Sequence, residues 1–400
     1  MLVGCSNGDG ETGTDTNTSN GEQTTITLTG WQSSPTEQRY LEDTIAAFED
    51  ANPDINVEIS TIADQYMNIL RTRLIGGEGP DVFFLEAFEA PGLIETGVVE
   101  PLDDYITDEF DLDDFEQPLV DAFRNNDGVL YGLPKDTSTL ALFYNKDMFE
   151  EAGIEEAPTT WMSLRWPNSC KAMDVYGFGV VPDLARLMFI AESNGGQIAV
   201  DNEAAFADPA VVDALQPIVD MRNELGIAGE PSEAGTDNGG EMFALERTAM
   251  IIEGNWTVPY LDENFPDVNY GVAEIPTVND EQGTMAYTVS YVMNAASEKK
   301  EASWRLIEYL TGKEGMEKWT SSGLTLPTRA SVSESLDYAD DPLYGPFVAG
   351  ASYATVWNDD TNLPIIYNNF NNQFLSAFLG QRDLQEALQE AQDVANNEID

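Results

Sequence analysis

The side chains that most often carry out catalysis are scarce in this chain of 400 residues, with the exception of carboxylates. The sequence has no histidine, two cysteines (Cys5 and Cys170), and 72 aspartates and glutamates. Histidine-based triads and histidine metal sites are therefore excluded, and no phosphate-binding glycine-lysine loop occurs. We expect no catalytic residue, no metal ion and no cofactor. The alternative chemistry is a carbohydrate hydrolase that uses two carboxylates about 5 to 9.5 Å apart.

The charge of the chain limits the ligands that it can attract. Eighteen lysines and arginines oppose the acids and leave a formal net charge of -54. Such a surface repels itself in dilute buffer, where the screening length is about 30 Å, but much less in molar salt, where it is about 3 Å. We interpret the charge as halophilic adaptation. The same field disfavours nucleic acid and anionic ligands and favours neutral or cationic solutes.

The first 24 residues differ in composition from the rest of the chain. Leu2-Val3-Gly4-Cys5 resembles the lipobox at which a signal peptide is cut and the cysteine receives a lipid. Residues 6–24 contain no large apolar side chain, which is typical of a flexible acidic tether. We expect Cys5 to be lipidated and the signal peptide to be truncated in this sequence. The alternative is an ordinary free or buried cysteine.

Hydrophobic periodicity indicates alternating strands and helices after the tether. Two segments alternate as strands, with apolar residues at Ile26 and Leu28 and at Val57 and Ile59, and the helical face between them carries Leu41, Ile45 and Phe48. The apolar run 82–85 follows a Gly-Pro turn and predicts a buried parallel strand. Glu86 ends this strand, where open α/β sheets bind ligands.

A helical stripe near the end of the chain completes the α/β pattern. It consists of Leu384, Ala387, Leu388, Ala391, Val394 and Ala395, with Asp383 and Glu386 as cap and third helical residue, and Gly380 ends the preceding helix. A chain of this length exceeds what one core usually supports, so we expect two lobes. No run of about 18 apolar residues is present to span a membrane.

Several segments, in order along the chain, resemble the extracellular solute-binding protein family 1, which includes maltose- and trehalose-binding proteins, in a haloarchaeal form. They are Gly79-Pro80-Asp81-Val82-Phe83, Val99-Glu100-Pro101-Leu102-Asp103, Tyr131-Gly132-Leu133-Pro134, Leu142-Phe143-Tyr144-Asn145-Lys146-Asp147, Pro158-Thr159-Thr160-Trp161, Gly254-Asn255-Trp256 and Leu326-Pro327-Thr328-Arg329. The resemblance implies an α/β fold of the two-lobed periplasmic-binding-protein type II, with a hinge and an interlobe cleft. It places lobe 1 at 25–136 and 289–334, lobe 2 at 140–285 and 338–400, and the hinge at 137–139, 286–288 and 335–337.

The resemblance also implies where a ligand binds. Trp256 matches the family's Gly-x-Trp position, whose indole stacks on the ligand, and the alternative is a core tryptophan. We expect Glu37 to contact the ligand, and the alternative is that its charge only stabilises the N-terminal end of its helix. Tyr287 stands where relatives commonly have glycines, so we expect its bulk to shorten the site. The full set of expected ligand-binding residues is Trp31, Gln32, Ser34, Glu37, Glu86, Asp136, Thr137, Trp256, Tyr287, Thr288, Trp357 and Tyr367.

The segment 162–171 departs from the family pattern. The family follows Thr-Trp with Asp-Glu-Leu and an amphipathic helix, whereas Met-Ser-Leu-Arg-Trp-Pro-Asn-Ser-Cys-Lys stands here and places Pro167 inside the expected helix. Adding one base before a possible coding sequence of this segment restores Asp-Glu-Phe-Ala-Leu-Ala-Glu-Gln-Leu-Gln. Our hypothesis is a compensated pair of frameshifts that makes Cys170 an artefact, and the alternative is true divergence.

These observations predict a solute-binding lipoprotein of an ABC importer that is not an enzyme. We expect it to capture a neutral mono- or oligosaccharide by lobe closure, to act as a monomer on the extracellular face of the cell membrane, and to deliver its ligand to the permease subunits. Nucleic acid is not an expected partner. Apart from the hydrolase, a surface adhesin is the remaining alternative, and it would show no ligand-dependent closure.

Overall fold

The computed structural model describes residues 23–31, 35–161, 175–358 and 362–399. Cys5 and the tether before residue 23, the expected ligand-binding residues Gln32 and Ser34, and the divergent segment 162–171 lie outside the described residues. Within these ranges, no helix combines the length and the apolar character needed to cross a membrane.

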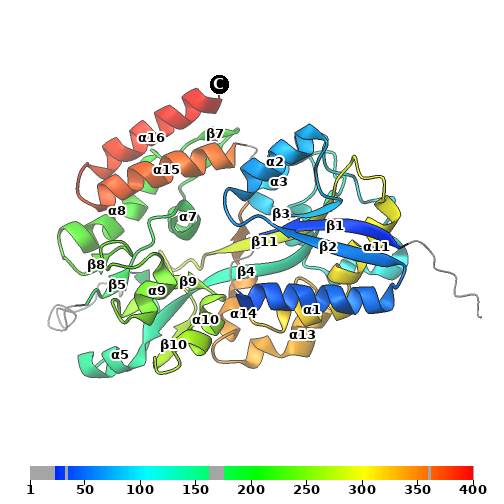
Figure 1. Ribbon diagram of the computed structural model, residues 1–400. Helices are drawn as coiled ribbons and strands as arrows, with labels where there is room; N and C mark the ends of the chain where they lie inside the picture. The colour runs from blue at the N-terminus through cyan, green and yellow to red at the C-terminus, as the bar shows by residue number, and fades with distance from the viewer. Residues whose placement is uncertain (1–22, 32–34, 162–174, 359–361, 400) are drawn as a thin grey trace, which may run out of the picture.

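The chain begins with alternating strands and helices (Figure 1). They are β1 (Thr24–Gly30), α1 (Pro35–Ala51), β2 (Ile55–Thr61), α2 (Tyr66–Gly76) and β3 (Val82–Glu86). β1 pairs in parallel with both β2 and β3, and α1 buries Leu41, Ile45 and Phe48. The predicted strand-helix-strand opening and the buried parallel strand are confirmed. Short helices follow, namely η1 (Ala87–Glu89), α3 (Ala90–Glu95), η2 (Asp108–Phe110), η3 (Leu112–Asp114) and α4 (Gln117–Asp121).

Two long strands join the two halves of the molecule. β4 (Gly132–Asn145) pairs antiparallel with β11 (Thr284–Met293) as far as Thr139 and with β9 (Met250–Gly254) from Leu140 onward. β11 itself pairs with β3 at one end and with β12 (Ala354–Val356) at the other. The strand order is β2-β1-β3-β11-β4-β9-β5-β8, in which β5 is Phe178–Gly179 and β8 is Ala228–Gly229, and β10 (Tyr270–Ala273) pairs with β4. In Figure 1, β4 and β11 run from one half into the other.

The elements between β4 and β11 form most of the second half. They are α5 (Lys146–Ala152), β5 (Phe178–Gly179), α7 (Leu184–Ser193), β6 (Ala199–Val200), β7 (Glu203–Ala204), α8 (Pro209–Asn223), β8 (Ala228–Gly229), α9 (Gly239–Ala244), β9 (Met250–Gly254), α10 (Thr257–Asn264) and β10 (Tyr270–Ala273). After β11 come α11 (Lys300–Thr311), α12 (Lys313–Thr320), α13 (Ala330–Leu336), η5 (Tyr338–Asp340), α14 (Gly345–Ala351), β12 (Ala354–Val356), α15 (Leu363–Phe378) and α16 (Leu384–Ile399).

Separate hydrophobic cores define the two lobes. The core of lobe 1 draws its residues from 26–133 and 291–332. The main core of lobe 2 draws from 140–285 and 357–395, and a smaller core around Phe143 completes this lobe. Leu326, which the sequence placed in lobe 1, packs in that smaller core with Phe347 of α14. The expected two-lobed α/β fold is confirmed.

The last helix illustrates how closely the hydrophobic pattern predicts packing. α16 buries Leu384, Ala387, Leu388, Ala391 and Ala395, and the carboxylate of Asp383 accepts the backbone N–H of Gln385 at 3.0 Å. Val394 was expected in the same stripe but is exposed. It lies one residue before Ala395, so the rotation of about 100° per residue carries its side chain past the packed face.

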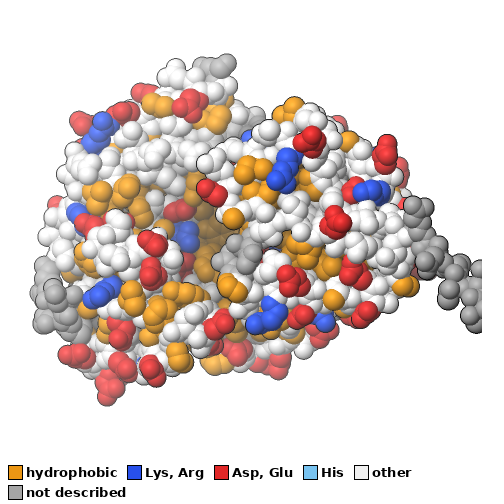
Figure 2. Space-filling model, viewed as in Figure 1, with side chains coloured by type: hydrophobic (Ala, Val, Ile, Leu, Met, Phe, Trp, Pro, Cys, Tyr) orange, Lys and Arg blue, Asp and Glu red, His pale blue; other side chains and the backbone are white. Residues whose placement is uncertain are grey.

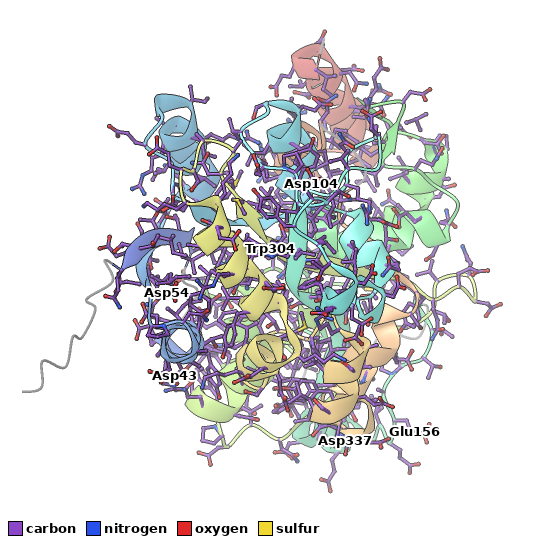
Figure 3. All side chains as sticks on the ribbon, turned by 90° about the vertical axis from the view of Figure 1, so that its right-hand side faces the viewer. Asp43, Asp54, Asp104, Glu156, Trp304 and Asp337 are labelled. Carbon is purple, nitrogen blue, oxygen red and sulfur yellow. The ribbon has the colours of Figure 1, made fainter. Side chains whose placement is uncertain are left out.

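The acidic residues are spread over the outside of the molecule. Figure 3 labels five of them at exposed positions, in contrast to Trp304, a buried residue of α11 that stacks on Tyr105 with ring centroids 5.6 Å apart. The labelled acids are Asp43, Asp54, Asp104, Glu156 and Asp337. Their distribution over separate elements agrees with the interpretation of the charge as a property of the whole surface.

Candidate functional site

A cavity of about 570 Å³ lies between the two lobes. Figure 2 shows the molecule hollowed here, with hydrophobic and basic side chains visible inside the hollow. Lobe 1 contributes residues that follow β1 and β3, and lobe 2 contributes residues that follow β9. At the rim, the hydroxyl of Thr36 on α1 donates to Glu263 on α10 at 3.0 Å, so one hydrogen bond already joins the lobes.

The lobe 1 wall is built around Trp31, directly after β1. Its ring meets Tyr66 and Phe84 edge to face, with centroid distances of 5.0 and 5.3 Å. Gly30 makes this packing possible, because a Cβ at Gly30 would lie 2.5 Å from the ring of Phe84. Glu37, in the first turn of α1, is buried beside the same cavity. An aromatic face and a carboxylate therefore stand next to one another on this wall.

A buried ion pair lies where β4 crosses beneath the cavity. The ammonium group of Lys135 is paired with Asp136, which also accepts the indole N–H of Trp319 at 2.7 Å. The same ammonium lies 4.2 Å from the ring centroid of Trp319 and 4.8 Å from that of Phe84, close enough for cation–π attraction. Lys135 is the extra residue of a β-bulge opposite Val289 and Ser290, which lets two successive side chains reach one cavity.

The lobe 2 wall carries Trp256 and a second ion pair. The ring of Trp256 folds back over Gly254, where a Cβ would lie 2.2 Å from it, and meets Tyr287 edge to face at 5.9 Å. The guanidinium of Arg186 lies 6.0 Å from the ring centroid of Trp256 and donates to Glu253 at 3.1 Å. Trp256 is only partly buried and lines the cavity. Its alternative placement, wholly inside a core, is excluded.

Glu86 is placed in the cavity by the end of β3. Glu86 is solvent-exposed through the open cavity, while the protein atoms packed around its carboxyl group remove part of its hydration. This desolvation, together with the charges of Glu89 and Asp136, raises the pKa of Glu86 to about 7. The carboxyl group therefore changes its charge near neutral pH.

Several buried polar atoms at the cavity have no hydrogen-bond partner within the described residues. They are Arg186 Nε, Thr257 Oγ1, Tyr287 Oη and Thr325 Oγ1, which make up half of the eight such side-chain atoms in the described part of the chain. Buried polar groups in proteins are normally satisfied. Their concentration at one cavity indicates a site for a polar ligand.

A second cavity of about 280 Å³ lies behind the first. The ring of Phe88, from η1 of lobe 1, stacks on Trp357 of lobe 2 with an interplanar angle of 3°. Tyr367 on α15 packs against both rings and donates its hydroxyl to Asp183 at 2.7 Å. Thr288 lines the same cavity and donates its hydroxyl to the carbonyl of Asp136 at 2.8 Å.

The structure brings most of the expected residues together but divides them between the two cavities. The first is lined by Trp31, Glu37, Glu86, Asp136, Trp256 and Tyr287, and the second by Glu86, Tyr287, Thr288, Trp357 and Tyr367. Thr137 lines neither: its buried hydroxyl donates to the carbonyl of Tyr287 at 3.0 Å. The expectation that it faces the cleft was wrong, because successive side chains of a strand point to opposite faces.

The charged and aromatic residues of the site that sequence reasoning missed include Lys135, Arg186, Glu253 and Trp319. The sequence features that mark these residues are weak. Lys135 and Asp136 are adjacent charged residues in an otherwise uncharged strand, and Glu253 directly precedes the Gly-Asn-Trp motif. A buried charge requires a partner, but the sequence does not identify it. Within the described ranges, no cluster of three His, Cys, Asp or Glu side chains is arranged to hold a metal ion.

Two lobes joined by crossing strands, with a cavity of ligand size between them, define a solute-binding protein. The chain belongs to the bacterial extracellular solute-binding protein family, whose model matches residues 43–346. This finding confirms the family relationship inferred from the ordered motifs.

Individual relatives agree with this assignment. A binding protein of Brucella abortus is 28% identical over an alignment of 373 residues that covers 88% of each chain. The galactooligosaccharide-binding protein of Bacillus subtilis is 23% identical and covers 90% of this chain and 86% of its own. A solute-binding protein of Thermotoga lettingae, solved with α-D-tagatose bound, superimposes with a TM-score of 0.82 at 26% identity, over 94% of this chain and 99% of that chain. The similarity extends over nearly the whole length in each case.

Proposed function

We propose that this chain is the solute-binding component of an ABC importer and that it captures a neutral sugar between its lobes without catalysing a reaction. The observation that carries the proposal is the set of partnerless polar atoms beside Trp31 and Trp256 in the interlobe cavity. Hydroxyl groups of a sugar satisfy such atoms, and indole rings cover its C–H faces. The sugars named for the relatives in Bacillus and Thermotoga support the same ligand class.

Binding on this proposal is a closure of lobe 1 (25–136 and 289–334) onto lobe 2 (140–285 and 338–400). The hinge is formed by residues 137–139, 286–288 and 335–337. The change of partner along β4 between Thr139 and Leu140 supports the first crossing, and the pairing of β11 with β3 from Val289 supports the second. The hydrogen bond between Thr36 and Glu263, which is present in this structure, is a contact that holds the two lobes together at the rim.

The protein then works outside the cell as a monomer, tethered by a lipid on Cys5, and passes its sugar to permease subunits in the membrane. On this proposal the polar segment 6–24 serves as the tether to the membrane. The excess of acids suits the surface to molar salt.

A thermal-unfolding screen against sugars in molar salt tests the proposal. A sugar present at about 100 times its Kd stabilises the folded protein by about 2.7 kcal/mol. The best sugar is then tested with Trp256→Ala and with Trp256→Phe as a matched variant that keeps an aromatic ring. Absence of stabilisation by any sugar contradicts sugar capture, and release of hydrolysis products favours the carboxylate-dependent hydrolase.

A further inference from the structure

The two interlobe cavities are separated by a partition that both of them share. Glu86, Arg186, Tyr287 and Val289 line each cavity. Glu86 comes from lobe 1, Arg186 from lobe 2, and Tyr287 and Val289 from β11, which joins the lobes. The narrow point between the front and back cavities therefore lies where the lobes and the connecting strand meet.

The polar groups of the partition are not bonded to one another. Tyr287 Oη and Arg186 Nε have no hydrogen-bond partner in the described part of the chain. The carboxyl of Glu86 likewise forms no hydrogen bond or ion pair with the described residues. Burial raises the pKa of the Tyr287 phenol, so this group remains a donor at neutral pH. Two partnerless donors are thus buried in the partition beside an acceptor, and this combination is the complement of a ligand hydroxyl.

The back cavity has the composition of a ligand subsite but not the size of a complete site. Its volume of about 280 Å³ falls just below the range of about 300 to 1,000 Å³ typical of ligand pockets. It is lined by the rings of Phe88, Trp357 and Tyr367 and by the hydroxyl-bearing Thr288. Taken with the front cavity, it extends the available space beyond Tyr287 instead of ending there.

We propose that the ligand is a sugar of at least two units, one in each cavity, with a hydroxyl group near their junction bound by Tyr287, Arg186 and Glu86. This inference rests on the proposed sugar-binding function and specifies the length of the ligand. It differs from the expectation that the bulk of Tyr287 shortens the site. Tyr287 instead provides a hydrogen-bonding group at the point where the ligand passes from one cavity to the other.

Matched pairs of sugars test the length of the ligand. Titration calorimetry in molar salt compares maltose with glucose and lactose with galactose, on the full chain. We expect the preferred disaccharide to bind at least about tenfold more tightly than its monosaccharide. Ala185→Leu, which adds volume to the back cavity, should remove most of this advantage. A cooperative thermal-unfolding transition without sugar shows that the variant is folded.

Tyr287→Phe provides a second test that leaves the ring in place. Loss of one hydrogen bond should weaken disaccharide binding by about 3- to 10-fold. The matched control is Tyr309→Phe, which removes a phenol oxygen from α11, away from both cavities. Equal affinity for one and two units, or disaccharide binding unchanged in both Ala185→Leu and Tyr287→Phe, overturns the two-cavity ligand but leaves sugar binding intact. Failure of all four sugars, together with failure of the wider screen, overturns the proposed function and this inference with it.

Discussion

Replacing Lys135 with methionine removes the cation that neutralises Asp136 beneath the cavity. Both side chains are almost fully buried, with relative exposures of 2% and 4%. After the substitution Asp136 keeps the indole N–H of Trp319 at 2.7 Å but no longer faces an ammonium group. Loss of one partner from a buried ion pair costs about 3 to 5 kcal/mol. Methionine can occupy the space between the rings of Phe84 and Trp319, so we expect a loss near the lower end, about 3 kcal/mol in the free energy of unfolding.

Urea unfolding in molar salt, followed by tryptophan fluorescence, measures this loss. Adding Asp136→Asn to Lys135→Met should restore most of it, because asparagine is uncharged and still accepts from Trp319. The matched control is Arg382→Met, since Arg382 pairs with Glu390 at the surface, where the side chains are 42% and 47% exposed and such a pair contributes about 0 to 1 kcal/mol. The reasoning is refuted if Lys135→Met costs no more than Arg382→Met, or if the double variant is as unstable as the single one.

Three further predictions concern the ligand, pH and salt. Trp256→Ala should weaken sugar binding at least about tenfold in calorimetry, because an aromatic contact of about 0.5 to 1.5 kcal/mol is lost together with its buried area. Trp256→Phe should retain much of the affinity. Equal binding by both variants and the native protein would contradict the role of the ring. The raised pKa of Glu86, about 7 when folded, means that the ligand-free protein loses stability as pH rises from about 4.5 through 7. Glu86→Gln should flatten this part of the pH profile in thermal unfolding, and an unaltered profile would show that other groups cause it. Lowering the salt from molar to millimolar concentration should lower the unfolding temperature steeply, as the net charge of -54 is no longer screened, and a salt-independent temperature would contradict halophilic adaptation.

The local periodicity of the sequence predicted the elements and much of the core. The alternation at Ile26 and Leu28 and the helical spacing of Leu41, Ile45 and Phe48 depend only on neighbouring residues, and the structure confirms both. Val394 shows the limit of this approach, because a small rotational error at the edge of a helical stripe decides whether a side chain is buried. The pattern is therefore most reliable at the centre of an apolar face.

The site was predictable only where a motif marked it. Trp256 and Glu86 were found through a motif and a strand end, whereas Lys135 was not, because its burial depends on Trp319 in α12, far away in the chain. The bulge at Lys135 also shifts the alternation of β4, so neighbouring strand positions could not be assigned to one face by counting. Long-range packing, which the sequence of one segment does not encode alone, decided these positions.

The position of β11 in the sheet constrains the order in which the chain can fold. β11 lies between β3 and β4, although it follows β4 by more than a hundred residues. During synthesis lobe 1 lacks the strand that fills the middle of its sheet until Met293 has emerged, and it still lacks α11 and α12 of its core at that point. Such long-range pairing is slow to form. A nascent chain of this design therefore stays incomplete through most of its elongation.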